Sequence, residues 1–411
     1  MVNPCSLPCS SRDSLEACIR LLVGTVLSAV GLLAVLEAPT HFLWMVAVGV
    51  TEWGYWLVPI ALAGVFLPSR HRFSGEASVG WRWAGRLGRV LALAGAVLLL
   101  SPLLRALLVA EQLEQDLAAA LPLGPAPTAG ARLAPTVGRP LQFMHLLSGA
   151  TQEPVRHISL VYAAPEGEPL RLDLYRSANL SPPAPAVIVI HGGSWQSGDR
   201  GQLADLNRYL ASRGYVVAAV GYRFAPRWPF PAARDDVRAA VAYLQTHASE
   251  LGLDPQRMVL LGRSAGGQLA LLVAYTTGDP AIRGAIAFYA PADLRYSYEH
   301  PGNPLVLDSR GVLTAYLGGS PEQRPEAYAA ASPLNFVGAG TPPTLLIHGE
   351  RDELVKPIQS ERLAARLAQA GRSVFFLPLP WATHGCDLHF SGPCGQLSTY
   401  AVERFLAAVV R

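Results

Sequence analysis

Residues 258–275 read MVLLGRSAGGQLALLVAY: four apolar residues, a serine set among glycines, and then a stretch rich in Ala and Leu. A short apolar run is typical of a buried strand, and an Ala/Leu-rich stretch is typical of a helix. Ser264 therefore lies where a strand is expected to become a helix. Such a corner is either an ordinary turn made of small residues or the position of a catalytic nucleophile. The choice depends on which other side chains the fold brings to it.

From about residue 154 onward, apolar runs alternate with amphipathic helical stretches. The runs HISLVYAA and LRLDLYR alternate apolar and polar residues, as an edge hairpin does. Short, almost wholly apolar runs follow at 186–190, 216–222, 258–262, 285–290, 344–349 and 374–379. Apolar strands separated by helices predict an α/β fold with a mostly parallel central sheet covered on both faces. We therefore expect one α/β domain over residues 154–411.

Reactive side chains gather at the carboxyl ends of the strands in such sheets. Four of the apolar runs are followed by candidates, which are the HGGSW segment after 186–190, Ser264, Asp352 and His384. A serine hydroxyl is a weak nucleophile that needs a base within hydrogen-bond reach. The order Ser, Asp, His along the chain is that of a nucleophile elbow. We predict Ser264 as the nucleophile, His384 as its base and Asp352 as the acid that orients the imidazole.

Backbone N–H groups beside the serine are expected to hold the negative charge that develops on a carbonyl oxygen. A helix that begins at Ala265 points its unpaired N–H groups at the site, and the HGGSW segment supplies others. The predicted oxyanion hole consists of Gly192, Gly193, Ser194 and Ala265. Gly262 and Gly266 flank the serine because a sharp turn leaves no room for a Cβ.

Some neighbouring residues have two interpretations. Trp195 either walls the acyl pocket or covers a loop, and we keep it as a candidate substrate contact. Arg263 either binds an acidic substrate or has a structural role, and we favour the second. The alternatives for the acid and the base are Glu350, Glu353 and His389.

The motifs IHGGSWQSGD, GYRFAP, LLGRSAGGQLAL, LIHGERDELV and THG together resemble those of the α/β-hydrolase superfamily. Within it they resemble the carboxylesterases of the hormone-sensitive-lipase-like and acetyl-esterase branch, over roughly residues 155–411. The resemblance implies ester hydrolysis through an acyl-enzyme, with no metal or organic cofactor. The family's G-x-x-D spacing from Gly349 favours Asp352 as the acid. HGGSW replaces the lipase-type HGGG and is similar to kynurenine formamidases, feruloyl-esterase-like proteins and prenylcysteine methylesterases, so the substrate class stays open.

Two rival functions use the same residues. An acyltransferase would pass the acyl group from the serine to a sugar or lipid alcohol instead of water. A non-catalytic hydrolase-like binding module is the other rival, but such modules usually lose the serine or the histidine, and here both are present.

The N-terminal part of the chain is unusually apolar. Charged residues make up 15% of the 411 residues, against roughly 25% in ordinary soluble proteins. Apolar stretches at about 19–37, 42–67 and 90–110 are each long enough to cross a hydrocarbon core of about 30 Å. A signal peptide explains the first stretch alone, but not three in series. We expect an all-α membrane region over 1–110, in contact with lipid. A linker over 111–153 follows, which begins with a short amphipathic stretch and is then rich in Pro, Gly and Ala.

The distribution of arginines predicts which side of the membrane each part of the chain occupies. The segment between the second and third stretches carries Arg70, Arg72, Arg82, Arg86 and Arg89, whereas the segment between the first and second carries no Lys or Arg. Positive segments stay in the cytoplasm. The expected location is therefore the cell membrane, with a cytoplasmic N-terminus and the α/β domain on the extracytoplasmic side.

Two cysteines lie close together in HGCDLHFSGPC. In an oxidising compartment Cys386 and Cys394 could close a short disulfide loop, and zinc is the less favoured alternative because the spacing matches no common zinc pattern. The net charge of +3, with Lys356 the one lysine, argues against a nucleic-acid partner. The sequence does not indicate an oligomeric state.

Overall fold

A computed structural model describes residues 9–66, 79–121, 138–149 and 155–410. The chain divides into two compact units, Met1–Arg105 and Ala106–Arg411. We call them the first unit and the second unit and describe each by itself.

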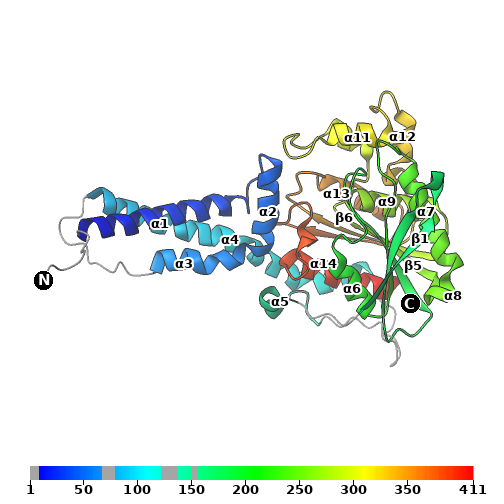
Figure 1. The fold of residues 1–411 in the computed structure, drawn as a ribbon, viewed down its shortest axis with the longest axis horizontal. Coiled ribbons are helices and arrows are strands. Elements are labelled where there is room, and N and C mark those ends of the chain that lie inside the picture. Colours follow the sequence, from blue (N-terminus) through cyan, green and yellow to red (C-terminus); the bar gives the residue numbers. More distant parts are fainter. Residues whose placement is uncertain (1–8, 67–78, 122–137, 150–154, 411) are drawn as a thin grey trace. The chain divides into compact units, whose positions relative to one another are not determined.

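The second unit is built on an eight-stranded sheet with the order β1-β2-β4-β3-β5-β6-β7-β8 (Figure 1). The first two pairings, β1 with β2 and β2 with β4, are antiparallel, and all the others are parallel. This confirms the mostly parallel α/β sheet and its edge hairpin. The strands are β1 (Val155–Ala163), β2 (Leu170–Ser177), β3 (Ala184–Ile190), β4 (Val216–Val220), β5 (Leu253–Arg263), β6 (Ile282–Phe288), β7 (Thr344–Gly349) and β8 (Val374–Leu379).

The central strands are apolar throughout because both of their faces are buried. Successive side chains of a strand point to opposite faces. In β3, Ile188 and Ile190 enter one hydrophobic core, whereas Val187 and Val189 enter the other. Helices cover each face (Figure 1). The first core is covered by α7 (Ala232–Thr246), α8 (Ala248–Leu251), α9 (Ala265–Thr276) and α13 (Ile358–Gln369). The second is covered by α6 (Ala204–Ser212), α14 (Pro393–Val409) and the end of α4 (Val79–Ala120).

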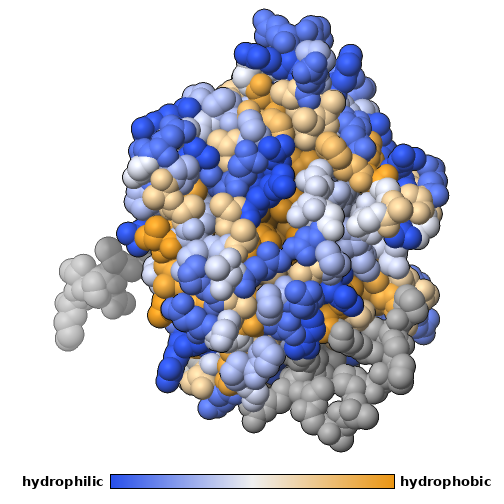
Figure 2. All heavy atoms as spheres, turned by 90° about the vertical axis from the view of Figure 1, so that its right-hand side faces the viewer, coloured by the Kyte–Doolittle hydropathy of each residue, from blue (hydrophilic) through white to orange (hydrophobic). Residues whose placement is uncertain are grey.

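The segment between β6 and β7 is a helical excursion. It contains α10 (Leu294–Glu299), α11 (Ser309–Leu317), α12 (Pro325–Ala330) and the 3₁₀ turn η3 (Pro333–Phe336), with α10 packed against α11 and α12 (Figure 1). Further short elements are α5 (Phe143–Ser148), η2 (Pro165–Gly167) and η4 (Cys386–Leu388). On the face shown in Figure 2, hydrophilic residues predominate and hydrophobic ones form small groups between them.

The first unit is helical. It contains α1 (Cys9–Leu32), α2 (His41–Trp53), η1 (Gly54–Leu57), α3 (Val58–Phe66) and most of α4 (Val79–Ala120). Among the residues that the structure describes, three segments are long and apolar enough to cross a membrane: Ser14–Leu32, His41–Phe66 and Gly80–Ala120. Helices α1 and α4 pack closely through glycines, since a Cβ on Gly24 would lie 2.4 Å from the carbonyl oxygen of Gly88.

The observed helices differ from the predicted stretches in their ends. The first stretch does not reach residue 37, because α1 ends at Leu32 and the next hydrogen bonds tighten to the i→i+3 pattern, Leu33 to Val30 and Ala34 to Gly31. The second stretch is not one α-helix: η1 interrupts it just before Pro59, which has no N–H to donate.

The third stretch is part of a longer helix. Helix α4 continues beyond 90–110 in both directions, so the first ten residues of the predicted linker are helical. Of the rest of that linker, 122–137 and 150–153 lie outside the described residues.

Candidate active site

Ser264 occupies a strained corner between β5 and α9. Its backbone has φ 53° and ψ −121°, a region that residues other than glycine rarely adopt and that often marks a functional site. A Cβ on Gly262 would lie 2.1 Å from the carbonyl oxygen of Gly266, and one on Gly266 would lie 2.2 Å from that of Ile190. The two glycines are therefore required by the close packing of β3, β5 and α9 around the serine.

The structure brings Ser264, His384 and Asp352 together. The Nε2 atom of His384 lies 3.0 Å from Ser264 Oγ, and its Nδ1 atom lies 2.6 Å from Asp352 Oδ2. The three residues come from the ends of β5, β8 and β7, which are the places that the sequence indicated. Because an ionised carboxylate only accepts hydrogen bonds, the proton lies on Nδ1, and Nε2 is free to accept the serine proton.

Asp352 is held in its ionised form. Its Oδ1 atom accepts hydrogen bonds from the N–H groups of Leu354 and Val355. Burial opposes ionisation of this carboxyl, but the imidazoles of His384 and His348 outweigh burial and lower its pKa to about 2. The carboxylate is therefore negatively charged across the physiological pH range.

His348 is a contact that the sequence analysis missed. It is fully buried in β7, and its Nε2 atom lies 3.2 Å from Asp352 Oδ2 and 2.8 Å from the carbonyl oxygen of Val355. Its Nδ1 atom contacts Ser360 Oγ at 2.7 Å. The position of His348 at the end of β7, four residues before Asp352, was the one available signal.

The HGGSW segment folds over the serine corner. A Cβ on Gly192 would lie 3.1 Å from the carbonyl oxygen of Arg263 and 3.4 Å from Ser264 Cβ. Gly193, Ser194 and Trp195 all have positive φ, at 122°, 55° and 57°. Their backbone therefore turns sharply beside the nucleophile, and Ala265, which directly follows Ser264, is the first residue of α9.

The Trp195 side chain is buried and its polar atom is occupied. The indole N–H donates to Gln268 Oε1 at 2.9 Å, and the ring stacks on Tyr316 at 4.2 Å between centroids. Gln268, one helical turn after Ser264, also donates to the carbonyl oxygen of Ala331 at 2.6 Å. No local sequence pattern indicates this role of Gln268, and a Trp195 contact with substrate stays a prediction.

Arg263, at the end of β5, contacts the loop that follows His384, and Cys386 lies on that loop. Arg263 is buried and ion-paired with Asp387, in agreement with the structural role that we favoured for it. Cys386 and Cys394 form a disulfide, so their sulfur atoms bond to each other rather than to a metal.

The comparisons with known proteins agree with this architecture. A family model described as BD-FAE matches residues 172–367. The chain is 32% identical to the probable carboxylic ester hydrolase LipM of Mycobacterium tuberculosis over 59% of both chains. It is 31% identical to an ethyl acetate hydrolase of Pseudomonas putida over 58% of this chain and 78% of the relative. The chain covers 59%, 56% and 62% of the lengths of LipM, esterase LipQ and esterase LipC from the mycobacterium.

Solved esterase structures share the fold. A bacterial heroin esterase aligns with a TM-score of 0.55 and 26% identity, over 74% of this chain and 99% of the esterase. The propionate-bound esterase Est2 of Thermogutta terrifontis aligns with a TM-score of 0.50 and 26% identity, over 60% of this chain and 91% of the esterase. This chain therefore belongs to the carboxylesterase family of α/β-hydrolases.

Proposed function

We propose that this chain is a membrane-anchored serine carboxylesterase that cleaves carboxylic esters through an acyl-enzyme on Ser264. The observation that carries the proposal is the continuous hydrogen-bonded relay from Ser264 Oγ through His384 to Asp352, with distances of 3.0 and 2.6 Å. A serine on a strained corner with this relay is equipped for acyl transfer.

In the first half-reaction, His384 Nε2 takes the hydroxyl proton while Ser264 Oγ attacks the ester carbonyl carbon. The tetrahedral intermediate collapses when the C–O bond to the alcohol breaks and the imidazolium returns the proton to the leaving alkoxide. In the second half-reaction, His384 takes a proton from water, the resulting hydroxide attacks the acyl-enzyme, and the carboxylic acid leaves as Ser264 regains its proton.

Asp352 and the backbone stabilise the charges that appear along this path. The Asp352 carboxylate keeps the proton on Nδ1 and compensates the imidazolium that forms. Backbone N–H groups of the predicted oxyanion hole, Gly192 to Ser194 and Ala265, stabilise the negative oxygen. One such donor contributes about 3–4 kcal/mol to the transition state. The close approach of Gly192 to the serine favours this role, because a Cβ there would lie 3.4 Å from Ser264 Cβ.

Membrane anchoring rests on the three candidate spans. Arg82, Arg86 and Arg89 at the start of α4 favour a cytoplasmic position for that end of the helix, which directs the second unit to the extracytoplasmic side. The Cys386–Cys394 disulfide is in keeping with such an oxidising compartment.

The catalytic test is release of p-nitrophenol from acetyl through palmitoyl esters by the full chain in detergent. We expect turnover by the wild-type chain and loss of it in Ser264→Ala. Ser212→Ala removes a hydroxyl that only bonds within α6, and we expect it to keep full activity. A wild-type chain without turnover, or activity that persists in Ser264→Ala, contradicts the proposal. Adding glycerol as an acceptor distinguishes hydrolysis from acyl transfer, because transfer yields a glyceryl ester.

The orientation test uses reporters fused to the C-terminus in a bacterial host. We expect an alkaline phosphatase fusion to be active and a green fluorescent protein fusion to be dark, because only the phosphatase folds correctly outside the cytoplasm. The opposite pattern contradicts the extracytoplasmic location while leaving the catalytic proposal untouched.

A further inference from the structure

The residue before the nucleophile makes a buried ion pair that esterase chemistry does not itself require. Arg263 ends β5, its side chain is 4% exposed, and its Nε donates to Asp387 Oδ2 at 2.5 Å. The guanidinium lies over the ring of Phe288. Burial disfavours the charged guanidinium, but Asp387 and Tyr289 outweigh burial and raise the pKa of Arg263. The arginine is therefore charged, and Asp387 is its counter-ion.

The acidic partner belongs to the loop that carries the catalytic histidine. Asp387 lies in η4, three residues after His384, and is also buried. Its second oxygen, Oδ1, accepts a hydrogen bond from Tyr289 at 2.5 Å. Burial and the Asp387 charge hold the pKa of Tyr289 well above its usual value, so the phenol is a neutral donor. The Tyr289 ring lies 4.4 Å from the His384 ring.

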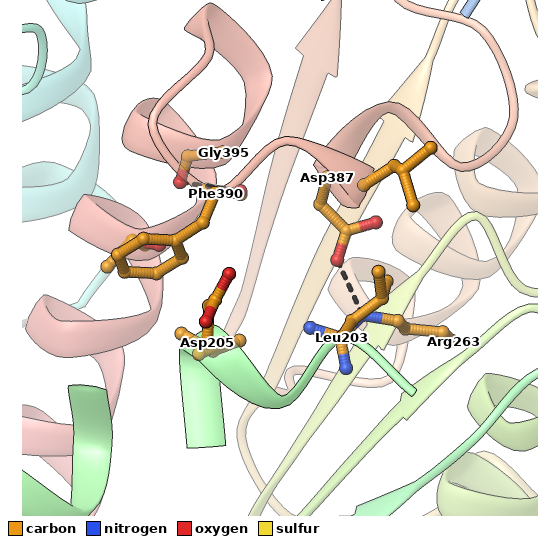
Figure 3. Close-up of a pocket in the computed structure, with 10 residues that line it drawn as sticks. Leu203, Asp205, Arg263, Asp387, Phe390 and Gly395 are labelled. Atoms are coloured by element: carbon orange, nitrogen blue, oxygen red, sulfur yellow. Dashed lines mark hydrogen bonds and ion pairs between the residues drawn. The ribbon is translucent and has the colours of Figure 1, made fainter. Parts of the chain in front are cut away.

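The pair is reached from the side of α6 and α14. A pocket is lined there by Arg263 and Asp387 together with Leu203, Asp205 and Phe390, and Figure 3 shows the ion pair at its wall. Ser264 does not line this pocket. The Arg263 side chain is thus occupied by a carboxylate of the protein, which removes the reason to assign it an acidic substrate.

Two buried charges of this kind fix the relative position of the segments that carry them. Each charge has lost its water, so either one left without its partner is strongly unfavourable. The pair therefore tolerates little separation between the end of β5 and the histidine loop. Catalysis has the same requirement, because a misplacement of about 1 Å lowers rates by about a hundredfold.

We infer that Arg263 and Asp387 are positioning residues that hold the His384 loop in register with Ser264. The inference rests on the proposed function. Arg263 directly precedes the nucleophile Ser264 in the chain, Asp387 lies on the loop that carries the base His384, and Tyr289 donates a hydrogen bond to Asp387. Reacting atoms do not touch either residue, so the effect is on geometry and not on charge transfer.

The test compares Asp387→Asn with Asp236→Asn in the full chain. Asp236 forms a second buried pair, with Arg223 at 2.8 Å, and lies on α7, which carries neither the serine nor the histidine. Both substitutions remove a buried carboxylate that pairs with an arginine and lower stability, and Arg223 keeps Glu166 at 3.2 Å as a second carboxylate partner. Should Asp387→Asn fail to fold, the double variant Arg263→Met/Asp387→Leu removes both charges and leaves no unpaired ion.

The readouts are kcat and KM on p-nitrophenyl butyrate and the rate at which a fluorophosphonate probe labels Ser264, all measured well below each unfolding temperature. We expect Asp387→Asn or the double variant to lower kcat and the labelling rate by about ten- to a hundredfold, with KM within about twofold. We expect Asp236→Asn to keep both rates.

A folded Asp387→Asn or double variant with wild-type kcat and labelling rate overturns the inference, and so does an equal loss in Asp236→Asn. A wild-type chain that the probe does not label overturns the proposed function, and the inference with it. Failure of the proposed function is distinguishable from failure of the inference, because the missing label on the wild-type chain is seen before any variant is measured.

Discussion

Gly262 and Gly266 stand so close across the serine corner that a Cβ on Gly262 would lie 2.1 Å from the carbonyl oxygen of Gly266. The same approach puts the first turn of α9 against the end of β3, where a Cβ on Gly266 would meet the carbonyl oxygens of Ile190 and His191 at 2.2 and 2.3 Å. These contacts are with backbone atoms, which cannot rotate away. The strained conformation of Ser264 is thus held from both sides.

Gly266→Ala is expected to displace α9 from β3. Overpacking of this kind costs about 1–3 kcal/mol or more, and it moves the nucleophile relative to His384. We expect a lower unfolding temperature and a loss of esterase activity of at least about a hundredfold. Gly338→Ala is the matched control, since no atom lies within 4 Å of the Cβ it would add. Wild-type activity in Gly266→Ala contradicts the steric account.

Gln268→Leu is expected to loosen the HGGSW segment. The change removes the acceptor of the Trp195 indole N–H and the donor to the Ala331 carbonyl oxygen. Each buried group left without a partner costs about 1–3 kcal/mol. We expect lower stability and a fall in kcat with little change in KM, measured by thermal unfolding and steady-state kinetics. Gln245→Leu, which loses a bond to Asp279 in a partly buried position, tests whether any lost glutamine contact has the same kinetic effect.

Acid is expected to remove the stability that Asp352 contributes. Its pKa is about 2 in the folded chain, below the ordinary value of 3.8. A lowered carboxyl pKa stabilises the fold above the unfolded value, and the stabilisation is lost as pH falls from about 3.8 through about 2. Asp352→Asn should therefore be less stable than wild type by about 2 kcal/mol at neutral pH, and the gap should narrow in acid.

Urea unfolding of the detergent-solubilised chain at several pH values measures this gap. Asp199→Asn is the control, because the Asp199 side chain is 71% exposed and its removal should change stability little at any pH. A gap between wild type and Asp352→Asn that is constant down to about pH 2 contradicts the assignment.

Gly88→Val is expected to separate α1 from α4 in the first unit. A Cβ at this position would lie 2.6 Å from the backbone nitrogen of Leu21 and from the carbonyl carbon of Arg20. Small residues let membrane helices approach closely, and their replacement weakens association. We expect faster proteolysis of the detergent-solubilised first unit than in the wild type. Gly64→Ala, whose Cβ would make an ordinary contact of 3.5 Å, should be digested at the wild-type rate.

Local sequence patterns predict much of the fold of the second unit. The apolar runs are recognisable because strands buried on both faces need apolar residues at every position, and the glycines around Ser264 are recognisable because a sharp strand-to-helix corner excludes a Cβ. The residues at which the N-terminal helices end were harder to predict from the sequence. The tightened turn after Leu32 and the break before Pro59 depend on hydrogen bonds that apolar composition does not encode.

By itself the sequence determined the order of strands and helices, the corner at Ser264 and the types of side chain that follow each strand, because short-range sterics and burial control these features. Tertiary structure alone decided that β3 lies between β4 and β5, that His348 supports Asp352, that Gln268 holds Trp195, and that Arg263 pairs with Asp387. The last two contacts join residues 73 and 124 positions apart. Partners at such separations are chosen by the packing of the whole unit, which no local pattern records.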